Sequence, residues 1–133
     1  GLSGNGITAE GIEFFPSAMR KNTGLRSLDL GMNKLADDGA KAIATMLTSS
    51  QDEGHDCQLA SLCIDQNGIS DVGADALATA LGGNGRLLNL RMRTNFVSEI
   101  QVNWLKTVAD RIMPGVERYV FMLQRIHFNA LTN

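Results

Sequence analysis

The chain has 133 residues, of which 44% are hydrophobic and 20% are charged, and its formal net charge is −2 at pH 7. This composition is typical of one globular unit, and the near-neutral charge excludes a strongly basic protein that attracts nucleic acid or an anionic membrane. The charge is nevertheless uneven: residues 1–66 carry five Lys/Arg and nine Asp/Glu (net −4), and residues 67–133 carry seven and five (net +2).

From the N-terminus onward, four segments repeat one pattern, in which apolar residues precede an asparagine and another apolar residue follows it. These segments are LSGNGI (2–7), LRSLDLGMNKL (25–35), LASLCIDQNGI (59–69) and LLNLRMRTNFV (87–97). A fifth and weaker copy is VERYVFMLQRI (116–126), with Gln124 at the asparagine position. The repeated asparagines are Asn5, Asn33, Asn67 and Asn95. Their separations of 28, 34 and 28 residues indicate a repeat protein.

Each copy predicts a short strand followed by a helix. In the Leu-x-x-Leu-x-Leu part, we expect the leucines to point into the core and the residues between them to face outward. After the asparagine, apolar residues recur at about one helical turn, which predicts an amphipathic helix packed behind the strand. The predicted helix N-caps are Thr8, Ser70 and Ser98, the last in a capping-box sequence that ends at Gln101. Because no single strand–helix unit buries its apolar side alone, neighbouring units must stack.

We interpret the repeated asparagine as structural. Where the chain leaves the strand, backbone groups lose their ladder partners inside a buried corner. A carboxamide carries both donors and acceptors and can satisfy these groups. One asparagine per repeat is therefore expected to form a ladder along the stack, made of Asn5, Asn33, Asn67 and Asn95.

With this pattern, the sequence resembles the leucine-rich repeat family, specifically its ribonuclease-inhibitor-like class. The resemblance rests on the unit of about 28–29 residues, the Leu-x-x-Leu-x-Leu-x-x-Asn-x-Leu segment and the helical second half, and it extends from Leu2 to about Ile126. It implies an α/β fold: a right-handed solenoid, a horseshoe segment with a parallel sheet on the concave side and helices on the convex side. Most members of the family are protein-binding scaffolds.

We expect one leucine-rich repeat domain over residues 1–133. Its repeats are predicted at 2–24, 25–58, 59–86 and 87–115, followed by 116–133 as a degenerate last repeat or cap. The second repeat is longer than its neighbours, and we place the extra residues in the polar run 49–58.

The fourth repeat and the ends of the chain depart from the pattern. The fourth helix has Gln101 where the first three have glycine, and it stops at Met113-Pro114-Gly115. Residues 116–128 fit a strand, which the spacing favours, or a capping helix. Because Leu2 is the last leucine of an incomplete strand, we expect the chain to come from a longer array.

The outward strand positions are the candidate binding surface. Along the predicted stack they change from acidic to basic, and the predicted partner-binding residues are Asp29, Asp65, Arg91, Arg93 and Arg118. Two compatible interpretations are an ion pair between Asp65 and Arg93 that keeps the surface soluble, and a polarised strip that docks a partner of complementary charge. The strip lacks aromatic anchors and offers about twelve positions, fewer than the roughly 20–30 of a standard interface. Further repeats or the run 49–58 are expected to contribute.

Other chemistry is not indicated. His55, Cys57 and Cys63 match no zinc spacing, so no metal or other cofactor is predicted. The sequence shows no nucleophile–base set and no phosphate loop, which predicts no enzyme activity and no small-molecule substrate. Phe96 and Trp104 are expected to be core or cap contacts. The outward arginines lack stacking aromatics and no apolar run reaches the ~18 residues of a membrane span, so neither nucleic acid nor membrane is a predicted partner.

The sequence therefore predicts a non-enzymatic scaffold that binds a protein partner through the concave face or flanking loops. Two alternatives stay open: a GTPase-activating or regulatory fragment like the Ran-activating members of the family, and a structural spacer in a larger assembly such as a cilium. Two cysteines are too few for a disulfide-stapled secreted domain, so we expect reduced thiols in an intracellular, cytoplasmic protein.

Overall fold

The computed structural model describes residues 1–48, 57–82, 84 and 86–112. Over these ranges the elements in chain order are α1 (Ala9–Ile12), α2 (Phe15–Lys21), β1 (Ser27–Asp29), α3 (Ala36–Leu47), β2 (Ser61–Cys63), α4 (Asp71–Gly82), β3 (Asn89–Arg91) and α5 (Glu99–Ile112). Strands and helices alternate from β1 onward, as the repeat pattern predicts. Most of the predicted long loop, residues 49–56, and the predicted last copy, 116–133, lie outside the described ranges.

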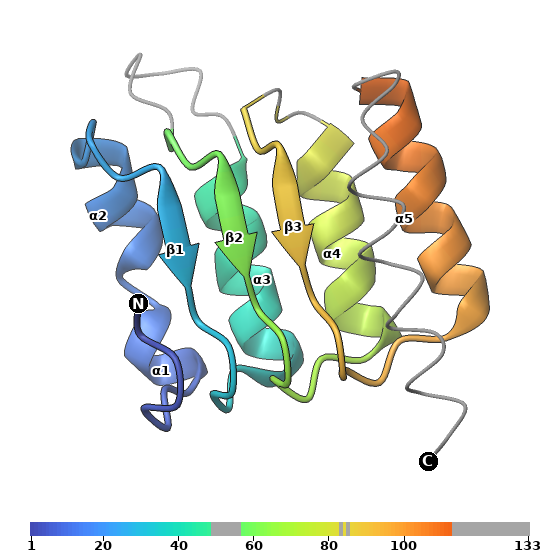
Figure 1. The fold of residues 1–133 in the computed structure, drawn as a ribbon, viewed down its shortest axis with the longest axis horizontal. Coiled ribbons are helices and arrows are strands. Elements are labelled where there is room, and N and C mark those ends of the chain that lie inside the picture. The colour runs from blue at the N-terminus through green and yellow to red at the C-terminus, as the bar shows by residue number, and fades with distance from the viewer. Residues whose placement is uncertain (49–56, 83, 85, 113–133) are drawn as a thin grey trace.

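The strands form a parallel sheet in the order β1-β2-β3. Equivalent residues of successive repeats pair in register, since Leu28 is opposite Leu62 and Leu62 is opposite Leu90. The helices lie behind the sheet, and neighbouring helices pack against one another along the stack (Figure 1). The described residues therefore form two layers, a sheet and a row of helices, and no other described element covers the outer side of the sheet. We call the open side the sheet face.

The hydrophobic core lies between these two layers. The central residue of each strand is buried, whereas its flanking residues are exposed or half-buried, as expected for a strand that is covered on one side. Most of the repeated apolar positions next to and within the strands are 0–1% exposed, namely Leu30, Leu59, Leu62, Ile64, Leu87, Leu90 and Met92, whereas Leu28 is 8% exposed and Leu25 is partly buried. Because burying each such side chain contributes about 1.5–3 kcal/mol, this layer is the main stabilising feature of the stack.

A helix glycine is required by the close approach of neighbouring repeats. A Cβ built on Gly73 would lie 2.7 Å from Asp37 Oδ1 and 2.9 Å from Ala40 Cβ of the preceding repeat. These distances are too short for any larger side chain without displacement of α3 or α4. The fourth repeat has Gln101 at the equivalent position, and its buried Nε2 has no hydrogen-bond partner among the described residues.

The single helix expected in the first repeat is divided into two. α1 ends at Ile12, and α2 begins at Phe15 with Pro16 in its first turn. Proline has no N–H to donate to the carbonyl four residues earlier, and its ring clashes with that carbonyl, so a continuous helix is interrupted. The first turn of a new helix accepts proline because its N–H groups have no intrahelical acceptors.

The residue before each asparagine has left-handed backbone geometry. Its φ angle is +70° at Gly4, +53° at Met32, +52° at Gln66 and +58° at Thr94. This turn directs the chain away from the strand direction, and after Met32, Gln66 and Thr94 it brings the following asparagine into the buried corner. Left-handed geometry costs roughly 1–2 kcal/mol for residues other than glycine, so the stack must hold three of these four turns in place.

Candidate functional site

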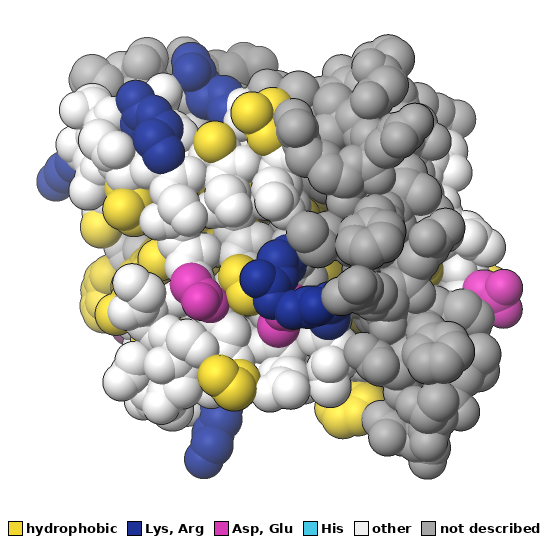
Figure 2. All heavy atoms as spheres, viewed as in Figure 1, with side chains coloured by type: hydrophobic (Ala, Val, Ile, Leu, Met, Phe, Trp, Pro, Cys, Tyr) yellow, Lys and Arg dark blue, Asp and Glu magenta, His cyan; other side chains and the backbone are white. Residues whose placement is uncertain are grey.

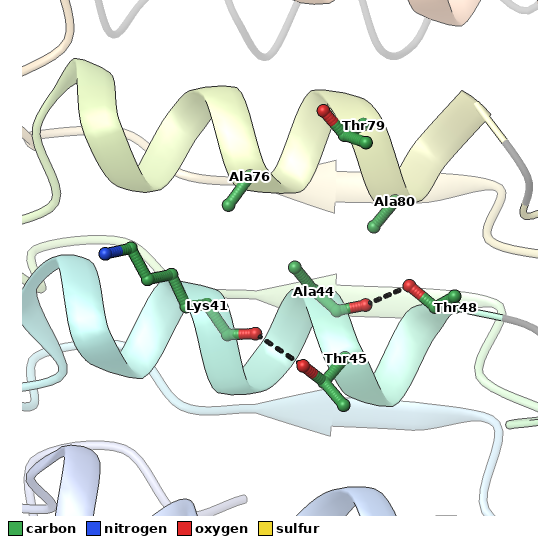
Figure 3. Close-up of a pocket in the computed structure, with 7 residues that line it drawn as sticks. All are labelled: Lys41, Ala44, Thr45, Thr48, Ala76, Thr79 and Ala80. Atoms are coloured by element: carbon green, nitrogen blue, oxygen red, sulfur yellow. Dashed lines mark hydrogen bonds between the residues drawn. The ribbon is translucent and has the colours of Figure 1, made fainter.

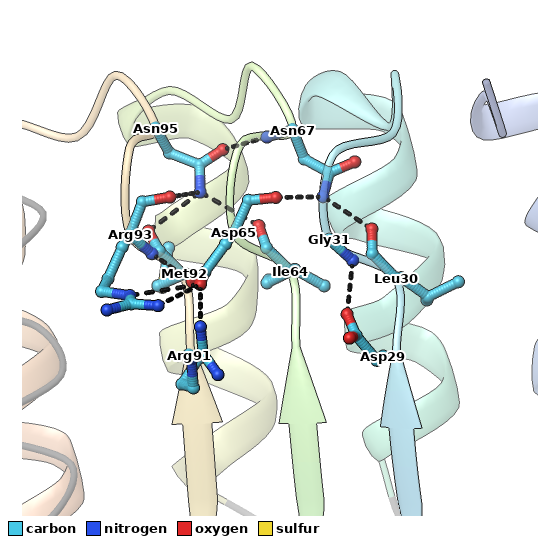
Figure 4. A network of polar contacts seen from close by, with 10 residues as sticks. All are labelled: Asp29, Leu30, Gly31, Ile64, Asp65, Asn67, Arg91, Met92, Arg93 and Asn95. Carbon is cyan, nitrogen blue, oxygen red and sulfur yellow. Dashed lines mark hydrogen bonds and ion pairs between the residues drawn. The ribbon is translucent and has the colours of Figure 1, made fainter. Parts of the chain in front are cut away.

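Asn67 and Asn95 lie side by side beyond the ends of the strands (Figure 4), and together with Asn33 they bridge consecutive repeats. Asn5, predicted as the first member of the ladder, is instead exposed, and its side chain bonds only to Ser3 among the described residues. Asn95 Oδ1 accepts hydrogen bonds from the N–H groups of Asn67 and Ile69, each at 3.0 Å. Asn95 Nδ2 donates to the carbonyl groups of Met92 at 2.9 Å and Ile64 at 3.1 Å. One carboxamide thus satisfies backbone groups of its own turn and of the preceding repeat, in a corner where Asn95 is 2% exposed.

Asn33 and Asn67 are arranged in a similar way. Asn33 Oδ1 accepts from the N–H groups of Asn5 and Ile7, each at 3.0 Å. Asn67 Oδ1 accepts from the N–H of Leu35 at 3.3 Å. Because these buried carboxamides are engaged with the backbone, the geometry argues for an architectural role and against a catalytic one.

A second set of contacts joins the N-termini of the helices, and the sequence analysis missed it. Asp37 of α3 accepts hydrogen bonds from Ser70 Oγ at 2.6 Å, from the Ser70 N–H at 2.8 Å and from the Gly73 N–H at 3.1 Å. Asp71 of α4 accepts from the N–H and Oγ of Ser98, both at 2.6 Å. Burial raises the pKa of Asp37, but the bonds from Ser70 and Gly73 outweigh this effect and hold the pKa below its ordinary value.

These aspartate contacts change the role of the predicted N-caps. Ser98 Oγ accepts from the Gln101 N–H at 3.3 Å and Ser70 Oγ from the Val72 N–H at 3.4 Å, both long for hydrogen bonds. Thr8 makes no side-chain cap bond at all. The two serines therefore serve chiefly to join repeats. The sequence does carry a sign of this contact. An aspartate stands four residues after the asparagine of one repeat, and a serine stands three residues after the asparagine of the next repeat.

On the sheet face, one carboxylate holds two arginines (Figure 4). Arg91 Nη2 donates to Asp65 Oδ2 at 2.6 Å, and Arg93 donates to the same oxygen from Nη2 at 3.0 Å and from Nε at 3.2 Å. The backbone N–H of Arg93 donates to Asp65 Oδ1 at 2.7 Å. The ion pair expected between Asp65 and Arg93 is therefore present, and Arg91 joins it.

The carboxylate of Asp65 and the guanidinium of Arg91 each favour the ionised form of the other. Partial burial raises the pKa of Asp65, but the hydrogen bonds from Arg93 and Arg91 outweigh that effect, so the pKa lies below its ordinary value. The hydrogen bond to Asp65 in turn raises the pKa of Arg91. With one negative and two positive groups, the cluster carries a net charge of +1 at neutral pH.

Asp29, Cys63 and Arg91 lie in one row across the sheet, since Asp29 pairs with Cys63 and Cys63 with Arg91. Asp29 is exposed, and its Oδ1 accepts from the N–H of Gly31 at 2.9 Å. At about 4.8 Å per strand, the acidic and basic ends of this row are about 10 Å apart. In Figure 2 one acidic side chain lies on the β1 side of a central group of basic side chains, and further Lys or Arg side chains lie above it on the same side.

The central residue of this row, Cys63, has a thiol of low reactivity. Burial raises the pKa of its thiol to about 11, and the thiol is consequently protonated at neutral pH. A protonated thiol is a poor nucleophile and a poor metal ligand. Cys63 therefore lines the sheet face without supplying a reactive group.

The charged residues line a shallow, solvent-open depression of about 240 Å³ on the sheet face. Its lining consists of Ser3, Asp29, Gly31, Met32, Cys63, Asp65, Gln66, Arg91 and Arg93. Gly31 has no side chain to fill the depression, and a Cβ added there would lie only 3.1 Å from Asp29 Oδ1. The depression lacks the apolar walls that typically enclose a small molecule.

A second depression, of about 400 Å³, lies between α3 and α4 on the helical face (Figure 3). It is lined by Lys41, Ala44, Thr45, Thr48, Ala76, Thr79 and Ala80. The Thr45 hydroxyl donates to the carbonyl of Lys41 at 3.1 Å and the Thr48 hydroxyl to that of Ala44 at 2.8 Å. With its hydroxyls bonded within their own helix, this groove brings no catalytic groups together.

The other predicted residues lie apart from the sheet-face cluster. Arg118 and His55 are outside the described ranges, and Cys57 is buried. Phe96 and Trp104, expected as core or cap contacts, are 65% and 44% exposed, so they are not core residues, and the cap predicted at 116–133 lies outside the described ranges. Within the described ranges, no three His, Cys, Asp or Glu side chains are grouped to hold a metal ion.

A family model described as a leucine-rich repeat matches residues 21–44 and 57–78. The first match spans β1, Asn33 and most of α3, and the second spans β2, Asn67 and most of α4. A search among curated proteins finds no match to the chain. In the part of the chain that the structure describes, every helix is too short or too polar to cross a bilayer.

Proposed function

We propose that this leucine-rich repeat protein is a non-enzymatic module that binds a protein partner through its sheet face. The residues proposed to form the contact are Asp29, Asp65, Arg91, Arg93 and Arg118. Among them, Asp65 positions the arginines, and the partner meets the arginines and Asp29.

The observation that carries this proposal is the pair of arginines oriented by one carboxylate. Asp65 accepts four hydrogen bonds and its side chain is only 13% exposed, whereas the side chains of Arg91 and Arg93 are 39% and 29% exposed. Holding the long side chains in place before binding reduces the entropy lost on association, which is about 0.5–1.5 kcal/mol for each immobilised side chain.

The arginines keep hydrogen-bonding capacity for a partner. Arg91 Nη1 and Arg93 Nη1 have no hydrogen-bond acceptor among the described residues, although each guanidinium is anchored through other atoms. A carboxylate is the natural acceptor for such a planar group. About 10 Å away across the sheet, Asp29 offers the opposite charge. We therefore propose a partner segment with an acidic side chain over the arginines and a basic one over Asp29.

The wider architecture belongs to the same proposal. Repeats of about 28 residues with helices behind the sheet favour the ribonuclease-inhibitor-like class and a right-handed solenoid whose concave side is the sheet face. In this arrangement residues 1–133 form one domain, with 116–133 as its last repeat or cap. The free, protonated thiol of Cys63 is compatible with an intracellular, cytoplasmic location.

The proposal is tested with a double variant, Arg91→Gln/Arg93→Gln, which removes both charges and leaves amide donors near Asp65. A binding protein is isolated with the unmodified chain and then titrated against each variant by calorimetry. We expect the double variant to raise Kd about tenfold or more, corresponding to about 1.4 kcal/mol.

The matched control is Lys34→Gln/Lys41→Gln, which removes two exposed positive charges away from the arginine cluster. This variant should bind with unchanged Kd, and thermal unfolding should show that both variants are folded. If the arginine variant binds as tightly as the unmodified chain, or if both variants lose affinity equally, the sheet face is not the specific site.

A further inference from the structure

Exposed apolar side chains gather near the N-termini of α4 and α5. The exposed fractions are 57% for Val72, 65% for Phe96, 83% for Ile100 and 44% for Trp104. Large aliphatic and aromatic residues exposed together mark interaction surfaces more often than isolated ones do. We name these four residues the apolar corner.

Contacts between the third and fourth repeats bring the residues of the apolar corner together. The backbone N–H of Phe96 donates to the carbonyl of Ile69 at 2.7 Å, and Ser98 is bonded to Asp71. The segment leading into α5 therefore lies alongside the start of α4. Trp104 follows Ile100 by four residues on α5, so both point from the same side of that helix.

The first two repeats show how these positions are arranged. Val72 and Ile100 each follow an asparagine by five residues, and Phe96 follows one directly. The equivalent residues of the first two repeats, Glu10, Asp38 and Lys34, line one shared depression. The same positions are thus charged at the first junction and apolar at the third.

The surroundings of the apolar corner are acidic. α4 contains Asp71 and Asp75 and no Lys or Arg, and the first six residues of α5 contain Glu99 and no Lys or Arg. Asp75 is exposed. The two helix N-termini contribute about half a positive charge each, which leaves the rim negative by roughly two charges.

We propose that the apolar corner is a second docking surface, and that its occupant is a basic amphipathic segment of a partner protein. Such a segment places a large apolar side chain against Ile100 and Trp104, and its Lys or Arg residues face the acidic rim. Aromatic residues such as Trp104 and Phe96 typically supply the anchors of an interface, and the sheet face lacks them among its lining residues. The two surfaces are chemically complementary to different segments, since the arginine cluster selects acidic groups and the apolar corner basic ones.

Trp104 makes this proposal directly measurable, because it is the only tryptophan of the chain. The probe is an amphipathic peptide made of leucine and lysine, and its control is the same peptide with glutamate in place of lysine. Neither peptide contains an aromatic residue, so tryptophan fluorescence reports on Trp104 alone. We expect the lysine peptide to shift the emission to shorter wavelength with saturation, and the glutamate peptide to leave it unchanged.

The variants Ile100→Ser and Met32→Ser distinguish binding at the apolar corner from nonspecific hydrophobic binding elsewhere on the surface. Ile100→Ser should weaken binding of the lysine peptide at least tenfold, and its 83% exposure means that the fold tolerates the change. Met32 is 58% exposed but lies on the sheet face, so Met32→Ser should bind as the unmodified chain does. Arg91→Gln/Arg93→Gln should also bind normally, which distinguishes this surface from the sheet face.

Three results would overturn the proposal. They are the absence of any shift with the lysine peptide, an equal shift with the glutamate peptide, and unchanged affinity of Ile100→Ser. A shift that grows with protein concentration in the absence of peptide, together with dimers in sedimentation velocity that Ile100→Ser abolishes, would show instead that the apolar corner binds a second copy of the chain.

Discussion

Replacing the ladder asparagines one at a time should give graded losses of stability, because they satisfy different numbers of backbone groups. Asn95→Ala removes the acceptor of two buried N–H groups, those of Asn67 and Ile69, and the donor to three carbonyls. Asn67→Ala removes the acceptor of one N–H group, that of Leu35, at the longer distance of 3.3 Å. Asn5 is exposed, and its Nδ2 donates only to the carbonyl of Ser3.

The magnitudes follow from the cost of an unsatisfied buried group. Each buried donor left without an acceptor costs about 1–3 kcal/mol, so the two donors orphaned by Asn95→Ala should lower the free energy of unfolding by about 2–6 kcal/mol. Asn67→Ala should lower it by about 1–3 kcal/mol on the same reasoning. Asn5→Ala, at an exposed position, should change it by less than about 0.5 kcal/mol.

Urea unfolding followed by circular dichroism measures these differences. Asn95→Leu is a useful companion variant, since it removes the same hydrogen bonds while filling the volume that alanine leaves empty. If the loss arises from unsatisfied backbone groups, Asn95→Leu should be destabilised to a similar extent. The reasoning is refuted if Asn95→Ala is no less stable than Asn5→Ala, or if Asn95→Leu restores the stability of the unmodified chain.

Three further predictions concern packing, acid stability and thiol reactivity. Gly73→Ala should lower the free energy of unfolding by about 1–2 kcal/mol, seen as a lower Tm, because a clash of about 2–3 kcal/mol exceeds the gain in helix propensity of about 1 kcal/mol. Folding lowers the pKa of Asp65, so its ionised carboxylate stabilises the fold above the ordinary pKa of 3.8. This contribution to the free energy of unfolding is lost as pH falls through the lowered pKa. In urea titrations at acidic pH, Asp65→Asn should therefore lose stability less steeply than the unmodified chain. With a pKa of about 11, Cys63 should react slowly with iodoacetamide at pH 7, and the rate constant should rise about tenfold per pH unit up to that value; fast reaction at pH 7 would contradict its burial.

The strands and the asparagine positions were predictable because they repeat. Three copies of Leu-x-x-Leu-x-Leu before an asparagine specify which side chains are buried, and Leu28, Leu62 and Leu90 indeed pair in register. The division of the first helix was also encoded, in Pro16, but the helical spacing of the apolar residues suggested a continuous helix instead.

Contacts between repeats were harder to predict. Asp37 and Asp71 look like ordinary first-turn carboxylates, and only the structure shows that each binds the serine at the start of the next helix. The left-handed turns at Met32 and Gln66 carry no glycine, so the sequence gives no local sign of them. These features depend on the distance between repeats, which a one-dimensional pattern does not contain.

The candidate sites show the same limit. The opposite charges of Asp65 and Arg93 predicted a pair, but not that Asp65 would bind Arg91 as well and become largely buried. Phe96 and Trp104 were expected to be core or cap contacts, but both are exposed. Their exposure depends on the direction in which the start of the fourth repeat presents them, which sequence composition does not specify.

Site-specific photo-crosslinking tests most directly whether the sheet face is the surface that binds a protein partner. A photoreactive phenylalanine derivative is placed either at Asp29, exposed on the sheet face, or at Thr45, exposed on the helical face. We predict that the binding protein crosslinks to position 29 and not to position 45, and that Arg91→Gln/Arg93→Gln suppresses the crosslink. Crosslinking at position 45 alone, or a crosslink at position 29 that persists undiminished in the arginine variant, would contradict the proposed role of the sheet face.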